Sequence, residues 1–383
     1  MKKIALNFAR IFVGVLFIFS GLIKANDPLG FGYKLQEYFD VFHISFLSPY
    51  ATGLAIFLCV LEIVLGALLL FGFWSKKVAT GLLGIIIFFT FLTFVSAAFK
   101  VVTSCGCFGD AIPLTPWQSF SKDLVLLALI VYLFIHRNLI LPVTNNALQQ
   151  KIASIAVVVA SVLFSVYTYT YLPIIDFLPY KIGASIPESM KIPAGAVPDE
   201  YLIMYKLKNK ATKETKEMSD KDYLKTEIWK DNNWEIVGNP EQKLIKKGYE
   251  AKIKDLVIND ASGTNYTNEL IENPFYNLII VAYNLKDTNE EAIAKLNALT
   301  LDVTEQYNLR TVLLTSNSAQ DAGAFSKKHK LFAEIFYADA VPLKSMVRAN
   351  PGVLLLKNGV VINKWSYSSM PTFEQLKTAY FNK

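Results

Sequence analysis

Two cysteines separated by a single glycine, Cys105 and Cys107, are the residues whose types and spacing most directly suggest chemistry. In an oxidising compartment such a pair can close into a small ring, because the glycine between them removes a steric obstacle. Strain makes a disulfide easier to reduce, and easily reduced disulfides are the ones that exchange. The pair is therefore predicted either to cycle between dithiol and disulfide or to form a structural disulfide that shapes its loop.

The third cysteine, Cys59, lies within an apolar block, ~12 Å below the outer end of the helix predicted there. It is either a resolving partner for the pair or a small core residue, which is the commoner role of an isolated buried cysteine. Metal binding by the thiolates of the pair would need further ligands. In the apolar first part of the chain, up to Leu172, His43 is the only histidine predicted to lie on the same side as the cysteine pair. We therefore expect no metal site.

Charged side chains also occur inside the apolar blocks. Glu62 falls near the middle of the second block, where an ionised carboxylate needs a partner or a proton. Arg10 in the first block is the nearest candidate partner, and Lys24 stands at the end of that block. The pattern favours a structural Arg10–Glu62 clamp, with a proton relay as the alternative.

The elements that must position these residues are apolar helices. The 383 residues are 53% hydrophobic with a mean hydropathy of +0.34, and charges are scarce before Leu172 but dense from Lys181 onward. Each apolar block is about long enough to cross a ~30 Å hydrocarbon core as a helix. The blocks are Ile4–Ile23, Ala51–Phe73, Val78–Phe99, Leu124–Leu141 and Ile152–Leu172.

These blocks predict an integral membrane protein in contact with the lipid bilayer. No small-residue cleavage site follows the first block, so we expect it to be a retained helix and not a signal peptide. The formal charge of +6 comes from scattered lysines without a long basic run, which argues against nucleic-acid binding. Glycines recur along the helices and are expected to permit close packing: Gly14, Gly21, Gly53, Gly66, Gly81 and Gly84.

The orientation follows from the loop charges. Alternate loops carry almost only basic residues, and the other loops mix both signs. The basic set is Lys2, Lys3, Lys76, Lys77, Arg137 and Lys151. The positive-inside rule then places the N-terminus in the cytoplasm, and five crossings of the inner membrane place the chain after Leu172 outside.

The second half of the chain has the pattern of a soluble α/β domain. Prolines between Pro173 and Pro198 mark a linker, and two short alternating runs predict a small β insertion at Tyr201–Leu207 and Trp234–Val237. Strands then alternate with helices, and a hairpin and a helix follow. The strands are predicted at Asp255–Ile258, Asn277–Tyr283, Arg310–Leu314, Ile335–Ala338, Val353–Leu356 and Val360–Trp365, and the helices at Glu290–Tyr307, Ala319–His329 and Phe373–Tyr380.

The first half resembles the DoxX/MauE group of four-helix membrane proteins. The resemblance covers about residues 4–141 and rests on three landmarks: the Arg10, Gly14, Gly21, Lys24 spacing before Asp27-Pro28, the Leu61-Glu62-x3-Gly66 segment, and the Cys-Gly-Cys-Phe-Gly loop. Members of the group are associated with membrane redox work, including disulfide formation and electron transfer to quinone. The resemblance implies that Cys105 and Cys107 form the thiol pair and makes a quinone the candidate cofactor.

Residues 248–383 resemble the thioredoxin fold, in particular its peroxiredoxin-like and TlpA-like branch. Pro351 stands where that family places a cis-proline before a strand. However, the position of the family's Cys-x-x-Cys pair, residues 283–289, reads Tyr-Asn-Leu-Lys-Asp-Thr-Asn and has no thiol. Since disulfide exchange needs a thiolate, this domain is not expected to perform it alone.

The predicted organisation thus has four parts: a transmembrane bundle over residues 1–143, a fifth transmembrane helix over 150–172, a linker with a β insertion over 173–247, and a thioredoxin-like extracytoplasmic domain over 248–383. The favoured function is a membrane redox accessory protein, an oxidoreductase or a subunit of one, that uses Cys105 and Cys107 with an extracytoplasmic partner. The alternative is a non-enzymatic scaffold whose cysteine-free domain binds an envelope partner. A transporter has less support, because no inverted repeat is detectable.

Overall fold

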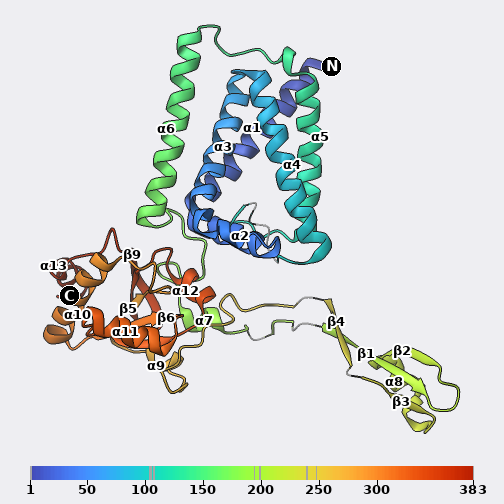
Figure 1. Ribbon diagram of the computed structural model, residues 1–383, viewed down its shortest axis with the longest axis vertical. Helices are drawn as coiled ribbons and strands as arrows, with labels where there is room; N and C mark the ends of the chain where they lie inside the picture. Colours follow the sequence, from blue (N-terminus) through green and yellow to red (C-terminus); the bar gives the residue numbers. More distant parts are fainter. Residues whose placement is uncertain are drawn as a thin grey trace. The chain divides into compact units, whose positions relative to one another are not determined.

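The computed structural model describes residues 2–102, 106, 108–193, 195–197, 200–238, 240–246 and 248–382 (Figure 1). Two compact units make up the chain. The first joins residues 1–185 to residues 256–383, and the second is residues 186–255. The predicted fold class, a helical membrane part followed by an α/β domain, is confirmed. The four predicted domain boundaries stay predictions.

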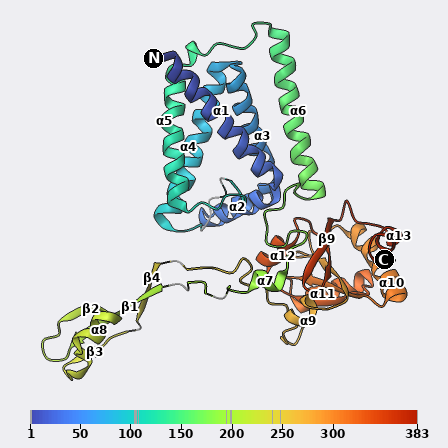
Figure 2. The same ribbon diagram turned by 180° about the vertical axis from the view of Figure 1, so that it is seen from behind.

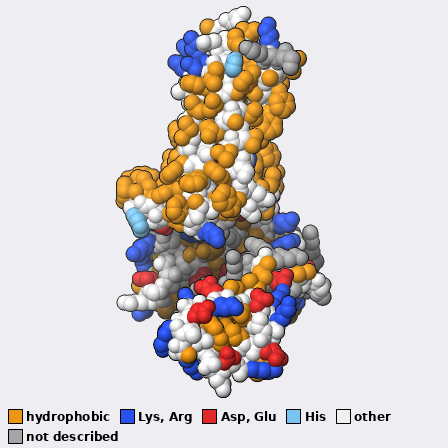
Figure 3. Space-filling view, turned by 90° about the vertical axis from the view of Figure 1, so that its right-hand side faces the viewer, with side chains coloured by type: hydrophobic (Ala, Val, Ile, Leu, Met, Phe, Trp, Pro, Cys, Tyr) orange, Lys and Arg blue, Asp and Glu red, His pale blue; other side chains and the backbone are white. Residues whose placement is uncertain are grey.

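Within the described residues, five helices are long and apolar enough to cross a membrane. They are α1 (Lys2–Asn26), α3 (Ala51–Phe71), α4 (Ser75–Phe99), α5 (Pro116–Ile135) and α6 (Ala147–Tyr171). Helix α6 packs against α1 and α3, while α4 packs against α5 (Figures 1 and 2). One face of the molecule shows mainly hydrophobic side chains over the bundle and charges of both signs away from it (Figure 3).

The fourth crossing was predicted too late in the chain, at Leu124–Leu141, whereas α5 spans Pro116–Ile135. Thr115 caps the helix in a reciprocal pair with Gln118, and Pro116 at the first position has no N–H to leave unsatisfied. The helix includes Asp123 because that carboxylate is neutralised: Lys122 Nζ lies 2.5 Å from one oxygen and Thr93 Oγ1 donates to the other at 3.0 Å.

A further helix, α2 (Pro28–Val41), lies where the sequence suggested only a charged loop. It lies across one end of the bundle (Figure 1) and is followed by the 3-10 segment η1 (Ser45–Tyr50). Its buried face includes Phe31, Leu35 and Phe39, which belong to the bundle core. The charged residues between these apolar ones lie on the opposite face, which is the pattern of an amphipathic helix. The segment was predicted as a loop because its charges were considered without that spacing.

Close packing of α1 on α3 depends on glycine. A Cβ on Gly66 would lie 2.8 Å from the Gly14 carbonyl oxygen, and one on Gly14 would lie 3.1 Å from that of Gly66. Gly21 faces Ile63 and the Cys59 carbonyl in the same way, and Gly81 faces Leu65. The prediction is therefore confirmed at these positions. It is wrong for two glycines that have nothing within 4 Å of a built Cβ, namely Gly53 and Gly84.

The α/β domain is a sheet whose described strands run in the order β7-β6-β5-β8-β9. Strands β5, β6 and β7 are parallel, whereas β8 is antiparallel to both β5 and β9. The strands are β5 (Tyr276–Val281), β6 (Arg310–Thr315), β7 (Glu334–Tyr337), β8 (Gly352–Lys357) and β9 (Val360–Ser366). The helices are α9 (Thr267–Ile271), α10 (Glu290–Tyr307), α11 (Ala319–His329), α12 (Ala340–Met346) and α13 (Phe373–Leu376), which continues as a π turn, η4 (Lys377–Phe381).

Most predicted elements of this domain are confirmed, and α10 and α11 have the predicted bounds. The strand predicted at Asp255–Ile258 is wrong: Asn259, just after it, makes isolated bridges with Asn265 and Tyr337. The Asn350–Pro351 bond is cis, as expected.

The second unit contains a small antiparallel sheet. Strand β1 (Glu200–Asn209) pairs with β2 (Thr215–Ser219), β3 (Trp234–Ile236) and β4 (Glu241–Lys246). The short elements α7 (Ile186–Met190), α8 (Asp220–Thr226) and η3 (Ile228–Lys230) complete the unit as described. The predicted strands at the positions of β1 and β3 are confirmed, whereas β2 and β4 were not predicted.

Gly66→Val should destabilise the bundle, because its side chain would collide with the backbone of α1. Overpacking of this kind costs about 1–3 kcal/mol. We expect a lower aggregation temperature for the detergent-solubilised variant than for Gly84→Val, whose site has nothing within 4 Å. Equal aggregation temperatures for the two variants would contradict glycine-dependent packing of α1 on α3.

Candidate functional site

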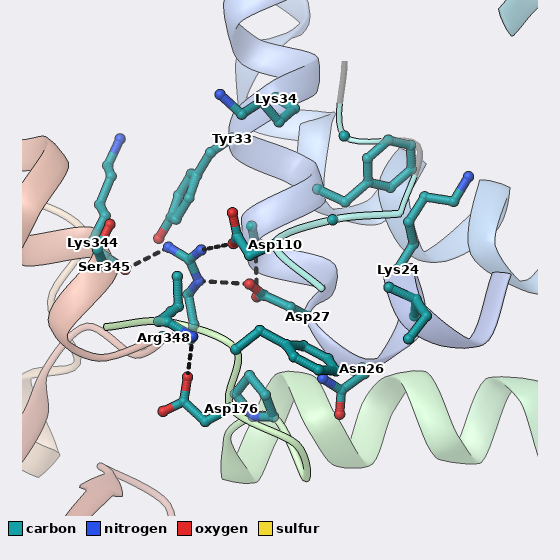
Figure 4. Close-up of a pocket in the computed structure, with 18 of the residues that line it drawn as sticks. Lys24, Asn26, Asp27, Tyr33, Lys34, Asp110, Asp176, Lys344, Ser345 and Arg348 are labelled. Carbon is teal, nitrogen blue, oxygen red and sulfur yellow. Dashed lines mark hydrogen bonds and ion pairs between the residues drawn. The ribbon is translucent and has the colours of Figure 1, made fainter. Parts of the chain in front are cut away.

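A cavity of about 330 Å³ lies at the end of the bundle where α2 crosses it (Figure 4). Its walls come from the end of α1, the helix α2, the loop after α4, the segment after α6, and the region of α12. The polar residues that Figure 4 labels are Lys24, Asn26, Asp27, Tyr33, Lys34, Asp110, Asp176, Lys344, Ser345 and Arg348. The cavity therefore collects charged side chains from segments far apart in the sequence.

Arg348, on the segment between α12 and β8, reaches into this cavity with 8% of its side chain exposed. Its Nε donates to Asp27 Oδ2 at 2.8 Å, its Nη2 donates to Asp110 Oδ2 at 3.3 Å, and its Nη1 donates to the Lys344 carbonyl at 2.6 Å. Burial opposes the charge of the guanidinium, but the two carboxylates outweigh it, so the pKa of Arg348 is raised. Arg348 thus connects the α/β domain by ion pairs to two separate segments of the membrane part, at Asp27 and at Asp110.

The two carboxylates have different surroundings. Asp27 is the N-cap of α2, and its other oxygen accepts from the Gly30 N–H at 2.9 Å. Asp110 belongs to the loop after α4, and burial raises the pKa of its carboxyl while Arg348 opposes that rise. Arg348 therefore links a helix start to the loop that follows the cysteine pair.

At the inner wall of the cavity, Lys24 forms a buried ion pair with Glu62. The side chains are 3% and 2% exposed. The ammonium group also lies over two aromatic rings, 4.6 Å from the Phe89 centroid and 5.1 Å from that of Phe31. A charge so far from water needs such partners, because its desolvation is costly.

The predicted Arg10–Glu62 clamp is wrong, because Lys24 takes that position. Arg10 instead donates to backbone carbonyls: Leu69 at 2.9 Å, Leu70 at 2.5 Å and Leu141 at 3.1 Å. The last carbonyls of a helix have no partner within it, and Arg10 satisfies those at the end of α3.

The predicted thiol pair, Cys105 and Cys107, falls outside the described residues. Gly106 between the two cysteines and Gly109 after them line the cavity, as does Asp110. Cys59 is fully buried in the bundle core, where its carbonyl lies against Gly21 of α1. This is the packing expected of a small core residue.

The α/β domain closes another side of the cavity region with polar side chains at its strand ends. Tyr283 Oη lies 2.8 Å from Tyr33 Oη of α2. The Asn284 carbonyl, in the segment after β5, accepts from Asn350 Nδ2 at 2.7 Å and from Thr288 Oγ1 at 2.6 Å. Beside these residues lies a more open, largely polar groove of about 970 Å³.

No group of three or more His, Cys, Asp or Glu residues in the described part of the chain could hold a metal ion. The sequence did not single out Arg348, Asp27 and Asp110 as a site. Asp27 carried a local signal, since an aspartate directly before a proline starts many helices. Arg348 carried none, because its partners lie 321 and 238 positions away.

The fold and this site define a multi-pass membrane protein with a water-facing α/β domain. Residues 2–136 match the family described as methylamine utilisation protein MauE. Protein TlpB of Flavobacterium psychrophilum is 30% identical over 128 residues, which are 33% of this chain and 35% of that protein. The matched segment thus spans about a third of that relative's length. No solved structure matches the chain.

Replacing one member of the Lys24–Glu62 pair should destabilise the bundle strongly, since it leaves a buried charge without its partner. We expect Lys24→Met and Glu62→Met each to cost about 3–5 kcal/mol, and the Lys24→Met/Glu62→Met double variant to cost less than the sum. Thermal unfolding in detergent measures both.

The matched control for this cycle is Lys34→Met. Lys34 pairs with Glu37, but both side chains are partly exposed, at 26% and 47%, so its loss should cost under about 1 kcal/mol. Additive losses in the Lys24/Glu62 double variant would argue against a coupled pair.

Proposed function

We propose that the protein is a membrane redox accessory protein that exchanges thiols and disulfides through Cys105 and Cys107 with an extracytoplasmic partner. The observation that carries this proposal is the position of Gly106, which lies between the two cysteines in sequence and lines a buried, charged cavity. The match of residues 2–136 to the MauE family supports it. So does the sequence of the α/β domain, which contains no cysteine and leaves the chemistry to the bundle.

The proposed exchange balances in bonds and electrons. A thiolate of the partner attacks the Cys105–Cys107 disulfide, and a mixed disulfide forms as the bond between the two cysteines breaks. The second partner thiolate then attacks the partner's sulfur in the mixed disulfide, which forms the partner's disulfide and releases the remaining cysteine as a thiolate. The partner gains a disulfide and loses two electrons and two protons, while Cys105 and Cys107 become a dithiol.

Cations near the loop favour this chemistry, since the attacking and leaving species are thiolates. The Cγ atom of Lys34 lies 3.4 Å from the place where Gly106 would carry a Cβ. Lys122 Nζ lies 5.2 Å from the ring centroid of Phe108, the residue after Cys107. Two lysines on different helices therefore stand beside the segment that carries the pair, and each is also paired with a carboxylate, Glu37 or Asp123.

Regeneration of the disulfide requires a two-electron oxidant, for which a quinone is the class that the family resemblance implies. Lys24 and Phe31 both line the cavity, so the Lys24 ammonium would donate to a quinone oxygen beside the Phe31 ring. A quinone held there would supply the capacity to accept the two electrons and two protons of the dithiol. In this proposal Lys24 and Phe31 bind and orient the head group.

The proposed orientation places this cavity on the extracytoplasmic side of the inner membrane. Lys76 and Lys77 begin α4, and Arg137 follows α5, at the end of the bundle away from α2 (Figure 1). Basic residues collected at one end of a bundle favour the cytoplasmic side for that end.

A scaffold function is the second candidate, and the open groove at the strand ends of the α/β domain favours it. The groove is lined by tyrosine, asparagine and aspartate side chains, which suit binding to a polar partner segment. In that case a disulfide in the loop after α4 would be structural, and the α/β domain would hold an envelope protein.

Cys105→Ser and Cys107→Ser should each abolish function in a complementation assay, because exchange needs both sulfur atoms. Each single variant should also trap a mixed disulfide with the partner, visible on a non-reducing gel. Cys59→Ser is the control and should retain function, since Cys59 is buried in the core. Full function of the Cys105→Ser/Cys107→Ser double variant would remove the redox proposal and favour the scaffold.

The orientation has its own test in intact cells or spheroplasts. After reduction, a membrane-impermeant maleimide should label the Cys59→Ser variant through Cys105 and Cys107. Ser75→Cys, at the opposite end of the bundle and in a Cys59→Ser/Cys105→Ser/Cys107→Ser background, should react only after the membrane is permeabilised. The reverse pattern would invert the proposed topology.

A further inference from the structure

Two sets of ion pairs with buried cations join the α/β domain to the bundle and the segment after it; of the carboxylates, Asp110 is 52% exposed. In the first, Arg348 pairs with Asp27 and Asp110. In the second, Lys364 of β9 pairs with Asp176, which follows α6. Lys364 is 7% exposed and Arg348 8%, so the two cations are equally withdrawn from water. Only the first pair reaches the loop that follows the cysteines.

The guanidinium of Arg348 packs against two residues of α2, Gly30 and Tyr33. A Cβ on Gly30 would collide with Asp27 Oδ2 and lie 2.9 Å from Arg348 Nη2. The guanidinium carbon also lies 5.6 Å from the ring centroid of Tyr33, and Tyr33 itself is hydrogen-bonded to Tyr283. Gly30 and Tyr33 of α2 thus form a slot for the guanidinium, and Lys344 Nζ lies over the same ring, 4.5 Å from its centroid.

The planar guanidinium of Arg348 has several N–H donors in a fixed geometry, so it can bind Asp27 and Asp110 at the same time. The guanidinium uses Nε on Asp27 and Nη2 on Asp110, and so spans two carboxylates from separate segments. A lysine ammonium is a single point charge on a flexible stem and does not have this fixed geometry. Asp27 is held by the start of α2, so Arg348 fixes Asp110 against that helix.

We propose that Arg348 is a positioning residue for the thiol loop: through Asp110 it holds the loop after α4 at the cavity and thereby sets the reactivity of the cysteine pair. This inference rests on the proposed redox function. It gives the cysteine-free α/β domain a role in the reaction, since that domain supplies the arginine. Arg348 acts through Asp110 and touches no reacting atom in this scheme.

The test compares Arg348→Met and Arg348→Lys with the matched control Lys364→Met in the full-length protein. The rate at which a membrane-impermeant maleimide alkylates the reduced pair is measured in a Cys59→Ser background, together with the midpoint potential of the pair in a dithiothreitol redox buffer. We expect Arg348→Met to change the alkylation rate about fivefold or more and to shift the potential. Arg348→Lys should restore little of either value, and Lys364→Met should keep both.

Gly30→Ala provides a second, independent variant, because it blocks the slot and leaves Arg348 in place. It should reproduce the effect of Arg348→Met, and thermal unfolding of every variant shows which of them are folded. An unchanged rate and potential in folded Arg348→Met or Gly30→Ala would overturn the proposal. Equal changes in Lys364→Met would also overturn it, since they would reduce Arg348 to one of two general docking contacts.

The redox function and the role of Arg348 can fail independently, and the cysteine variants distinguish the two cases. If the Cys105→Ser/Cys107→Ser variant complements fully, the redox function is lost, yet an altered alkylation rate in Arg348→Met would still show that Arg348 positions the loop. If the cysteines are essential and Arg348→Met leaves the pair unchanged, the redox function stands and the role of Arg348 falls.

Discussion

The constraint on which the rest of this structure depends is that an ionised side chain withdrawn from water must meet an opposite charge. Lys24 and Glu62 satisfy it inside the bundle, where both side chains are almost completely buried. Their meeting requires α1 to lie close to α3, and that distance is set by Gly14, Gly21 and Gly66. The Lys24–Glu62 ion pair therefore depends on the three glycines, because bulkier residues at these positions would move α1 away from α3 and separate the two charges.

The same constraint joins the α/β domain to the bundle. Arg348 and Lys364 are buried as deeply as a core side chain, and their carboxylate partners come from segments that precede the domain in sequence. Contacts at an exposed interface would leave these cations in water, whereas here both are buried. The two pairs are among the contacts that join residues 1–185 to residues 256–383, together with the Tyr33–Tyr283 and Ser366–Thr170 hydrogen bonds.

The sequence predicted those elements whose signals are local. The ends of α10 and α11 are determined locally: Asn289 or Ser318 caps the start of each helix, and a residue in the left-handed conformation follows its end. Helix α5 was misplaced because Lys122 and Asp123 look like loop residues until Thr93 of another helix is known to face them. The partner of Glu62 was misjudged for a related reason, since depth along a helix does not state which residue of the neighbouring helix faces it. Arg348 could not be found at all, because nothing near it in sequence indicates two distant aspartates.

The cysteine-free sheet of the α/β domain is easier to understand when its strand ends are considered as a contact surface. In the proposed scheme the redox groups belong to the bundle, so the residues at the strand ends are free to serve another purpose. Tyr283 meets Tyr33 of α2, and Asn350 donates to the carbonyl of the neighbouring Asn284. Arg348, three residues before the cis-proline, extends from the same edge to the loop after α4. A surface that in a thiol-bearing domain would meet a partner is here directed at the chain's own membrane half, and this is the physical basis for assigning the domain a positioning role.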